Sequence, residues 1–479
     1  MSISVLENHP ARARWRRNNP GSFLLLCPVL MVLSCATSPA KPSHGFEKVE
    51  TGQYSSSDPG SLLEADFLRT IPSSEEWLML AAASPWLIGT EIKMDVLKKE
   101  GYAAWRTSRL PTLSEIQSVR ILFTARRPEG SREKQSGTVF VPVVRNGRQQ
   151  KLSWVIFAKG TEIRRDFTPS RGKGRELPFI TALAALGYAV WVPDYSGMGD
   201  GQGIHDYCVA ESLADSALDG LAAARRWLGK AMAADGRLAY AESGRLAIIG
   251  YSEGGLTVMG AIKAIAEDRI PTPGLRLEVA YPMGAPLNLA IEVPTLGNTP
   301  LAISHPEYQV FLGLGWARAY PEESKPADIF STRTIDRIVP LFDGTRSDVN
   351  LNRRITMIVG KKAGSVTDAD IFSPEYLSAL RRNPASRAYY RVQIAARLDN
   401  WTPPQGISLI LAATPSDEIV PFANSQNEYD WAARYSPLAD VTLVRLASKG
   451  HIVAGAEAFL YAIVDLDRRE ARAKAASSL

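Results

Sequence analysis

Several features that would indicate other classes of protein are missing from this 479-residue chain. Its formal net charge of +5 is small for its length, and it has no sustained stripe of lysine and arginine, so we expect no nucleic-acid partner. It contains no internal repeats. The hydrophobic content of 45% and the charged content of 22% are typical of a globular protein, long enough for one large domain with an insertion or for two domains.

The N-terminal region has no apolar run long enough to cross a membrane as a permanent helix. Four arginines between positions 12 and 17 precede a short apolar run from Phe23 to Leu33, which is followed by Ser34-Cys35-Ala36. This pattern predicts an export signal over residues 1–34. Because residues 32–35 are similar to the lipobox of bacterial lipoproteins, we expect lipid on Cys35 and anchoring in the cell envelope, with plain cleavage to a secreted or periplasmic protein as the alternative. Residues 35–61 are rich in Ser, Pro and Gly, which predicts a flexible tether.

Cysteine is scarce, with three residues in the whole chain. Cys27 belongs to the predicted signal and Cys35 to the predicted anchor, so Cys208 has no partner for an intrachain disulfide. An exported protein of this kind must rely on its hydrophobic core for stability.

One stretch has the pattern of a strand, a sharp turn and a helix. The apolar run from Leu246 to Ile249 stops at Gly250-Tyr251-Ser252-Glu253-Gly254, and small and apolar residues follow. Glycine on both sides lets the chain pass closely while the serine is held in strained backbone geometry, and this exposes the hydroxyl. The turn therefore predicts Ser252 as a nucleophile, with a structural glycine-rich turn as the alternative.

Short buried strands alternate with helical stretches from Ser153 onward, which predicts a mostly parallel sheet flanked by helices, an α/β fold. We expect strands at Trp154–Ala158, Tyr188–Pro193, Leu246–Ile249, Leu277–Tyr281, Ser408–Ala413 and Val441–Leu446, and helices at Leu177–Leu186 and Ser212–Leu228. Before them, runs at 119–125 and 137–144 predict an antiparallel hairpin. Residues 62–113 are expected to form helices and loops that pack on the main domain.

About 120 residues separate Pro286 from the strand at Ser408, which is far too long for a simple loop. We expect residues 62–285 and 405–479 to form the core, and residues 286–404 to form a helical cap or lid over the active site. A separate binding module is the alternative for this insertion.

A serine nucleophile needs a general base, and the chain has only five histidines. His9 lies in the signal, His44 in the tether and His305 in the expected cap, which leaves His205 and His451. His451 follows the last predicted strand, where a loop can bring its imidazole back to Ser252, so it is the predicted base.

The base needs a carboxylate to orient it, and the loop after the strand at 408–413 offers two adjacent acids. Asp417 is the predicted partner of His451, and Glu418 is the alternative.

The oxyanion of the reaction needs two backbone donors. We expect these to be the N–H of Glu253, at the start of the helix, and the N–H of Thr161, with Gly160 as the alternative to Thr161.

At these positions the chain resembles the α/β-hydrolase lipases that include the fungal secretory lipases and related bacterial lipases and esterases. The motifs that carry the resemblance are Lys159-Gly160-Thr161, Asp166-Phe167-Thr168-Pro169-Ser170, Pro193-Asp194-Tyr195-Ser196-Gly197-Met198-Gly199, His205-Asp206-Tyr207, Asp219, the turn Gly250 to Gly255 and Gly284-Ala285-Pro286. They lie within residues 118–460. Lys159 stands where the family has histidine, and Phe167 stands where it has cysteine.

The resemblance implies an α/β-hydrolase fold with a helical cap, and a lipase or carboxylesterase that cleaves aliphatic or aromatic esters without a metal or another cofactor. It also implies that His205 belongs to a structural loop. The order Ser252, Asp417, His451 along the chain is the order of this fold. Two other functions stay open: a serine peptidase on short peptides, and an inactive, surface-tethered binding protein. The sequence does not indicate the oligomeric state.

Overall fold

A nine-stranded mixed sheet organises the computed structural model, which describes residues 58–72, 113–144, 150–234, 240–289, 302–362, 364–382 and 398–476. The predicted signal, Cys35 and most of the predicted tether lie outside these ranges. Among the described residues, no helix is both long and apolar enough to cross a membrane.

The strand order in the sheet is β1-β2-β3-β5-β4-β6-β7-β8-β9. In chain order the strands are β1 (Leu62–Pro72), β2 (Leu113–Arg126), β3 (Arg132–Val144), β4 (Gln150–Ala158), β5 (Tyr188–Pro193), β6 (Tyr240–Tyr251), β7 (Arg276–Met283), β8 (Ser408–Ala413) and β9 (Asp440–Arg445). In this sheet order, the pairs β1–β2, β2–β3 and β3–β5 are antiparallel. The following pairs, from β5–β4 to β8–β9, are parallel. The predicted hairpin and all six strands predicted for the parallel part are confirmed.

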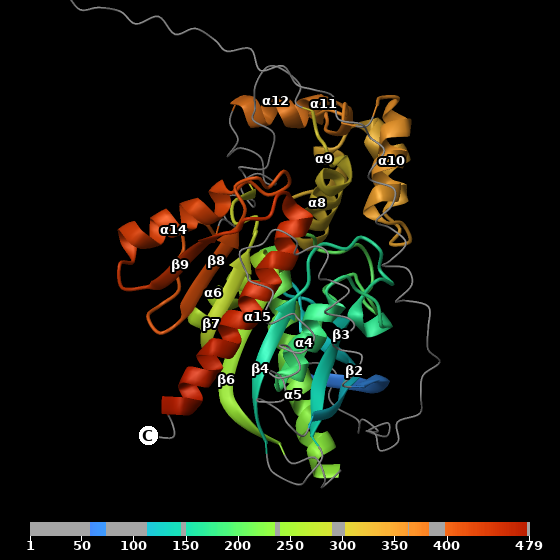
Figure 1. Ribbon diagram of the computed structural model, residues 1–479. Helices are drawn as coiled ribbons and strands as arrows, with labels where there is room; N and C mark the ends of the chain where they lie inside the picture. The colour runs from blue at the N-terminus through green and yellow to red at the C-terminus, as the bar shows by residue number, and fades with distance from the viewer. Residues whose placement is uncertain are drawn as a thin grey trace, which may run out of the picture. The chain divides into compact units, whose positions relative to one another are not determined.

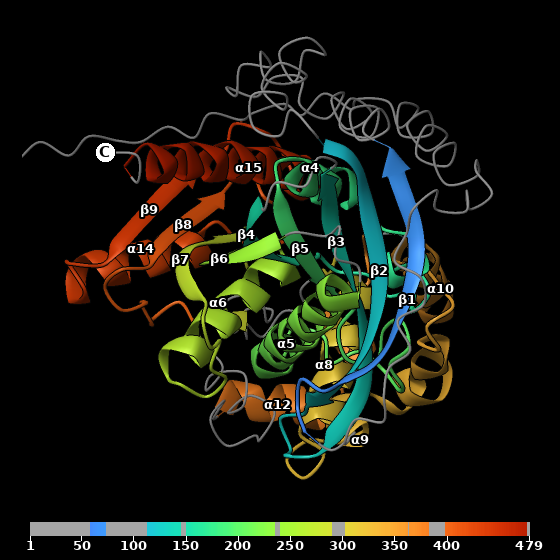
Figure 2. The ribbon, with the colours of Figure 1, turned by 90° about the horizontal axis from the view of Figure 1, so that it is seen from below.

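Helices cover both faces of the parallel part, as the continuous apolar runs of its strands require. Figure 2 shows α4 (Leu177–Ala185) and α15 (His451–Ala476) on one face, and α5 (Ala210–Ala234) and α6 (Glu253–Ala266) on the other. Each face has its own hydrophobic core. Another helix, α14 (Ala423–Tyr435), follows β8. The predicted α/β class is confirmed.

The expectation of helices and loops after Leu62 is wrong for residues 62–72, which form the edge strand β1. Its pairing with β2 is irregular between Leu62 and Glu64 and again between Phe67 and Arg69. Each irregularity shifts the side-chain alternation by one position, so the segment does not show the regular period of two that identifies a strand.

Between β7 and β8 the described chain is mostly helical. The α-helices of the described residues there are α8 (Pro306–Ala319), α9 (Pro326–Ile329), α10 (Asp348–Val359), α11 (Asp368–Ile371) and α12 (Pro374–Arg382), and they lie together at one end of the sheet in Figure 1. All five fall within the predicted insertion, residues 286–404.

Candidate active site

Ser252 lies at the sharp turn between β6, which ends at Tyr251, and α6, which begins at Glu253. Its φ of 59° and ψ of −125° are unusual for a residue with a side chain. A Cβ on Gly250 would lie 2.2 Å from the carbonyl oxygen of Gly254, and a Cβ on Gly254 would lie 2.1 Å from that of Ala158. Both glycines are therefore required by close backbone contacts, as the sequence pattern predicts.

The structure brings Ser252, His451 and Asp417 into one series of hydrogen bonds. Nδ1 of His451 lies 2.7 Å from Oδ2 of Asp417, and Nε2 lies 2.9 Å from Oγ of Ser252. Because an ionised carboxylate can only accept, Nδ1 carries the proton and Nε2 is free to accept from the serine hydroxyl. The other oxygen of Asp417 accepts the N–H groups of Ile419 and Val420, at 2.9 and 2.8 Å, and this fixes the carboxylate.

The two acids of the β8–α14 loop have different partners. The Asp417 side chain is wholly buried and contacts the imidazole of His451. Oε2 of Glu418 instead accepts the main-chain N–H of His451 at 3.0 Å. That N–H begins α15 and has no partner within the helix, so Glu418 satisfies a helix terminus.

The other two described histidines do not contact Ser252. His205 is buried against Glu253 and is described further below. His305 lies beside the cavity and forms a 3.0 Å contact with Glu307, which raises the pKa of His305.

Tyr251 is a neighbour of the site that sequence reasoning missed. Its hydroxyl donates to the carbonyl oxygen of His451 at 2.8 Å and lies 3.5 Å from Oδ2 of Asp417. Its ring centroid is 4.9 Å from that of the imidazole. The residue before Ser252 thus contacts both of the other members of the series.

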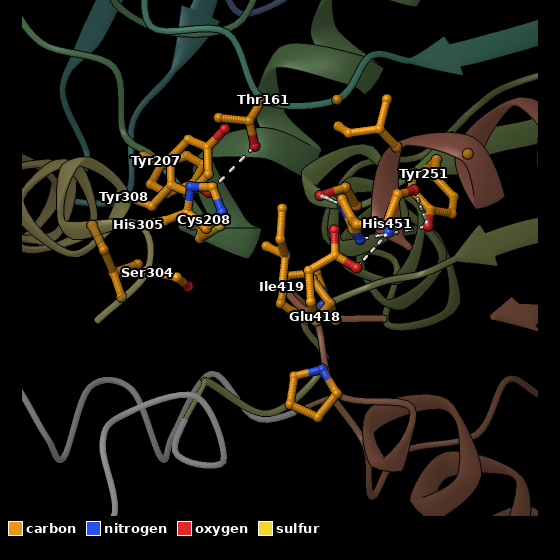
Figure 3. Close-up of a pocket in the computed structure, with 18 of the residues that line it drawn as sticks. Thr161, Tyr207, Cys208, Tyr251, Ser304, His305, Tyr308, Glu418, Ile419 and His451 are labelled. Carbon is orange, nitrogen blue, oxygen red and sulfur yellow. Dashed lines mark hydrogen bonds between the residues drawn. The ribbon is translucent and has the colours of Figure 1, made fainter. Parts of the chain in front are cut away.

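The loop after β4 supplies the candidate oxyanion donors. The N–H of Gly160 donates to Glu176 at 3.1 Å, so this donor is already engaged. Thr161 lines the cavity, and its hydroxyl donates to the hydroxyl of Tyr207 at 3.3 Å (Figure 3). Of the two alternatives in this loop, Thr161 is therefore the better candidate.

Lys159, which stands where the lipases that the sequence resembles have histidine, lies against Tyr195. The side chain is buried, and its ammonium lies 4.5 Å from the ring centroid of Tyr195. The hydroxyl of Tyr195 donates to the carbonyl oxygen of Lys159 at 3.0 Å and accepts from Thr257 of α6 at 3.1 Å. The loop is thereby tied to α6.

Ser252 and His451 open into a cavity of about 420 Å³, a volume that suits a small-molecule substrate. In Figure 3, Tyr207, His305 and Tyr308 lie on one side of the cavity, and Tyr251 and His451 lie on the other. The predicted insertion contributes part of the wall. Apolar lining residues include Phe179, Leu289, Ile303, Leu312, Ile419 and Phe459, and polar ones include Arg175, Glu176, Gln309 and Glu418. In the part of the chain that the structure describes, no three His, Cys, Asp or Glu side chains are grouped to hold a metal ion.

No family model and no curated protein sequence matches the chain. Solved structures do resemble it. The rice cell wall degrading esterase LipA from Xanthomonas oryzae matches with a TM-score of 0.61 and 20% identity, over 86% of this chain and 98% of that one. A suggested hydrolase from Legionella pneumophila matches with a TM-score of 0.64 and 20% identity, over 85% and 97%.

Lipase A from Candida antarctica, in its closed state, matches with a TM-score of 0.54 and 13% identity, over 83% of this chain and 79% of that one. The chain therefore has the α/β-hydrolase fold that its sequence motifs predict.

Proposed function

We propose that this protein hydrolyses carboxylic esters through an acyl-serine intermediate. The observation that carries the proposal is the series Asp417, His451 and Ser252, with contacts of 2.7 and 2.9 Å at the wall of the cavity. This is the arrangement that serine hydrolases use on several unrelated folds. The esterase and the lipase among the similar structures support the same reaction class.

In the acylation step, Oγ of Ser252 attacks the ester carbonyl carbon and passes its proton to Nε2 of His451. The carbonyl electrons move to oxygen, and the N–H groups of Glu253 and Thr161 stabilise the resulting anion. Asp417 stabilises the imidazolium of His451. Collapse of the tetrahedral intermediate breaks the bond to the alcohol, which leaves with the proton from Nε2.

Deacylation follows the same course with water as the nucleophile. Nε2 of His451 takes a proton from the water as its oxygen attacks the acyl carbon, and the second tetrahedral intermediate forms at the same N–H groups. Its collapse returns the proton to Oγ of Ser252 and releases the carboxylic acid. Both steps are written without a cofactor.

The cavity walls favour an ester with an apolar acyl or aromatic group. Leucine, isoleucine and phenylalanine side chains from the insertion, the β8–α14 loop and α15 form much of the surface around Ser252. Burial of an apolar group there is worth about 25 cal/mol per Å² removed from water. We therefore propose aliphatic or aromatic esters, including lipids, as the substrate class.

Labelling with a fluorophosphonate tests the nucleophile and the competence of the site together. We expect one adduct per chain by intact mass, mapped to Ser252, and a loss of at least about 10⁴-fold in ester turnover in Ser252→Ala. Near-full activity in Ser252→Ala would refute the proposal, and folded protein that takes no label would favour an inactive binding protein. Faster cleavage of aminoacyl anilides than of p-nitrophenyl esters would favour a peptidase.

The proposed setting of this reaction is the cell envelope, through lipid on Cys35. The support is the sequence pattern of residues 12–36 alone. Incorporation of labelled palmitate that disappears in Cys35→Ala is the expected result. Release of unlabelled wild-type protein into the periplasm or the medium would overturn it.

A further inference from the structure

Glu253 follows Ser252 directly, and its side chain is buried beneath the turn, with 1% of the residue exposed. One carboxylate oxygen, Oε1, lies 2.7 Å from Nε2 of His205 and accepts the N–H of Cys208 at 3.3 Å. Such a buried carboxylate is costly to leave without a partner. The contact with His205 therefore needs an explanation beyond packing.

The contact of Nδ1 of His205 determines where the protons of the His205–Glu253 pair lie. Nδ1 lies 2.8 Å from the carbonyl oxygen of Ser196, which can only accept, so Nδ1 carries a hydrogen. One further proton is then shared between Nε2 of His205 and Oε1 of Glu253. Whichever atom holds it, the pair carries no net charge next to the place where the oxyanion forms.

His205 is itself held by the rest of the molecule. Its ring stacks on Tyr195, with centroids 5.5 Å apart and planes 9° apart. Arg318 of α8 donates to the hydroxyl of Ser196 at 2.5 Å and to Asp206 at 2.7 Å. Ser196, whose carbonyl oxygen contacts His205, and Asp206, the residue after His205, are thus both held by the helical insertion.

The peptide between Ser252 and Glu253 is held at its carbonyl group, because the oxygen of Ser252 accepts the N–H of Leu256 at 3.2 Å in the first turn of α6. The N–H of Ser252 donates to Met283 at 2.9 Å, and the carbonyl of Glu253 accepts the hydroxyl of Thr257 at 3.0 Å. These main-chain contacts hold the start of α6 on the side of its backbone. The Glu253 side chain leaves the Cα atom next to this N–H, and its contacts with His205 and Cys208 hold that atom from a second direction.

We propose that Glu253 and His205 are a pair of positioning residues, which aim the backbone N–H of Glu253 at the oxyanion and keep the buried site behind Ser252 electrically neutral. This inference rests on the proposed ester hydrolysis. The pair touches no substrate, so its effect is exerted through the oxyanion donor and appears in the transition state.

Two substitutions of similar shape separate hydrogen bonding from packing. Glu253→Gln can donate to the neutral imidazole of His205, whereas Glu253→Met fills the same space without a hydrogen bond. We expect Glu253→Gln to stay within about threefold of the wild-type kcat, and Glu253→Met to lose about 10- to 100-fold with KM changed less than about threefold. Asp215→Asn, at a buried carboxylate paired with Arg269 away from the cavity, is the control and should leave kcat unchanged.

A second measurement uses the wild-type protein and does not depend on the folding of any variant. The proton between Nε2 of His205 and Oε1 of Glu253 should give a slowly exchanging, far-downfield NMR signal that shifts when a phosphonate occupies Ser252. Equal kcat in Glu253→Met and wild type, an equal loss in the Gln and Met variants, or a signal that does not move would each overturn the inference. A wild-type protein that neither turns over esters nor takes the phosphonate would instead refute the proposed function.

Discussion

Tyr251 illustrates how a single residue can support the proposed reaction through its contact with a catalytic neighbour. Its hydroxyl donates to the carbonyl oxygen of His451 at 2.8 Å. Burial and the neighbouring Asp417 carboxylate raise the pKa of Tyr251, so the phenol stays protonated and continues to donate over the working pH range. In Tyr251→Phe this hydrogen bond is lost, at a cost of about 1 kcal/mol. We expect kcat for a p-nitrophenyl ester to fall about fivefold with little change in KM.

A buried tyrosine elsewhere provides the control for Tyr251→Phe. Tyr281 of β7 donates to Asp465 of α15 at 2.9 Å, and it does not line the cavity. Tyr281→Phe removes a comparable buried hydrogen bond, so its unfolding midpoint should fall by a similar amount while kcat stays at the wild-type value. Equal kcat losses in the two variants would show that Tyr251 acts only through global stability.

The roles proposed for Ser252, Asp417 and His451 could be predicted because each depends on local sequence. Ser252 has its glycine neighbours, and Asp417 and His451 each follow a predicted strand. Tyr251 and Glu253 also flank the serine, but their partners come from α15 and from the loop after β5. Sequence spacing does not indicate which distant loop a side chain will meet, so these contacts could not be predicted.

At the scale of elements, α8 is fixed to the core by a partly buried group of charges. Arg318 contacts Asp206 and Glu133, each at 2.7 Å, and the Asp206 side chain is wholly buried. Arg127 also lies near Asp206, at 3.6 Å. Arg318→Met would remove one of the positive charges that compensate the carboxylates of Asp206 and Glu133. We expect the free energy of unfolding, measured by chemical denaturation, to fall by about 3 kcal/mol.

An exposed arginine provides the comparison for Arg318→Met. Arg276 of β7 pairs with Glu278, but its side chain is 76% exposed. Pairs of this kind contribute about 0–1 kcal/mol because water screens them. If Arg276→Met and Arg318→Met lower stability equally, the charges around α8 do not hold it in place.

The elements themselves were predictable where a strand is buried on both faces. The expected strands Tyr188–Pro193 and Ser408–Ala413 coincide with β5 and β8, because an unbroken apolar run between turns has few other interpretations. The edge strand β1 has irregular pairing and was not recognised. Sheet edges tolerate such irregularity because no second neighbour enforces the register.

At the scale of the whole molecule, the sequence indicates that a long helical insertion follows β7, but not the space it leaves around Ser252. The cavity wall combines residues of the insertion, such as Leu312, with Thr161, Ile419 and Phe459 from three other parts of the chain. Its volume depends on how these side chains pack together. No local pattern determines that packing, which is why acyl-chain length could not be predicted.

Stability of the whole molecule should depend on pH through Glu428 of α14. Burial, together with the nearby Asp399 carboxylate, raises the pKa of Glu428 to about 9, although the main chain of Trp401 offsets part of the effect. In the unfolded chain a glutamate has a pKa of about 4.3. Between these values the folded protein keeps a proton that the unfolded chain releases, so rising pH favours unfolding.

Glu428→Gln tests this dependence because glutamine resembles the protonated acid and cannot ionise. At about pH 5 the variant and the wild type should unfold at similar temperatures, and by about pH 9 the variant should be the more stable of the two. Glu267→Gln, at a side chain that is 52% exposed, should follow the wild-type curve throughout. Parallel curves for Glu428→Gln and wild type would mean that Glu428 is ionised in the folded protein, which would require a positive charge or a bound cation beside it to compensate for its burial.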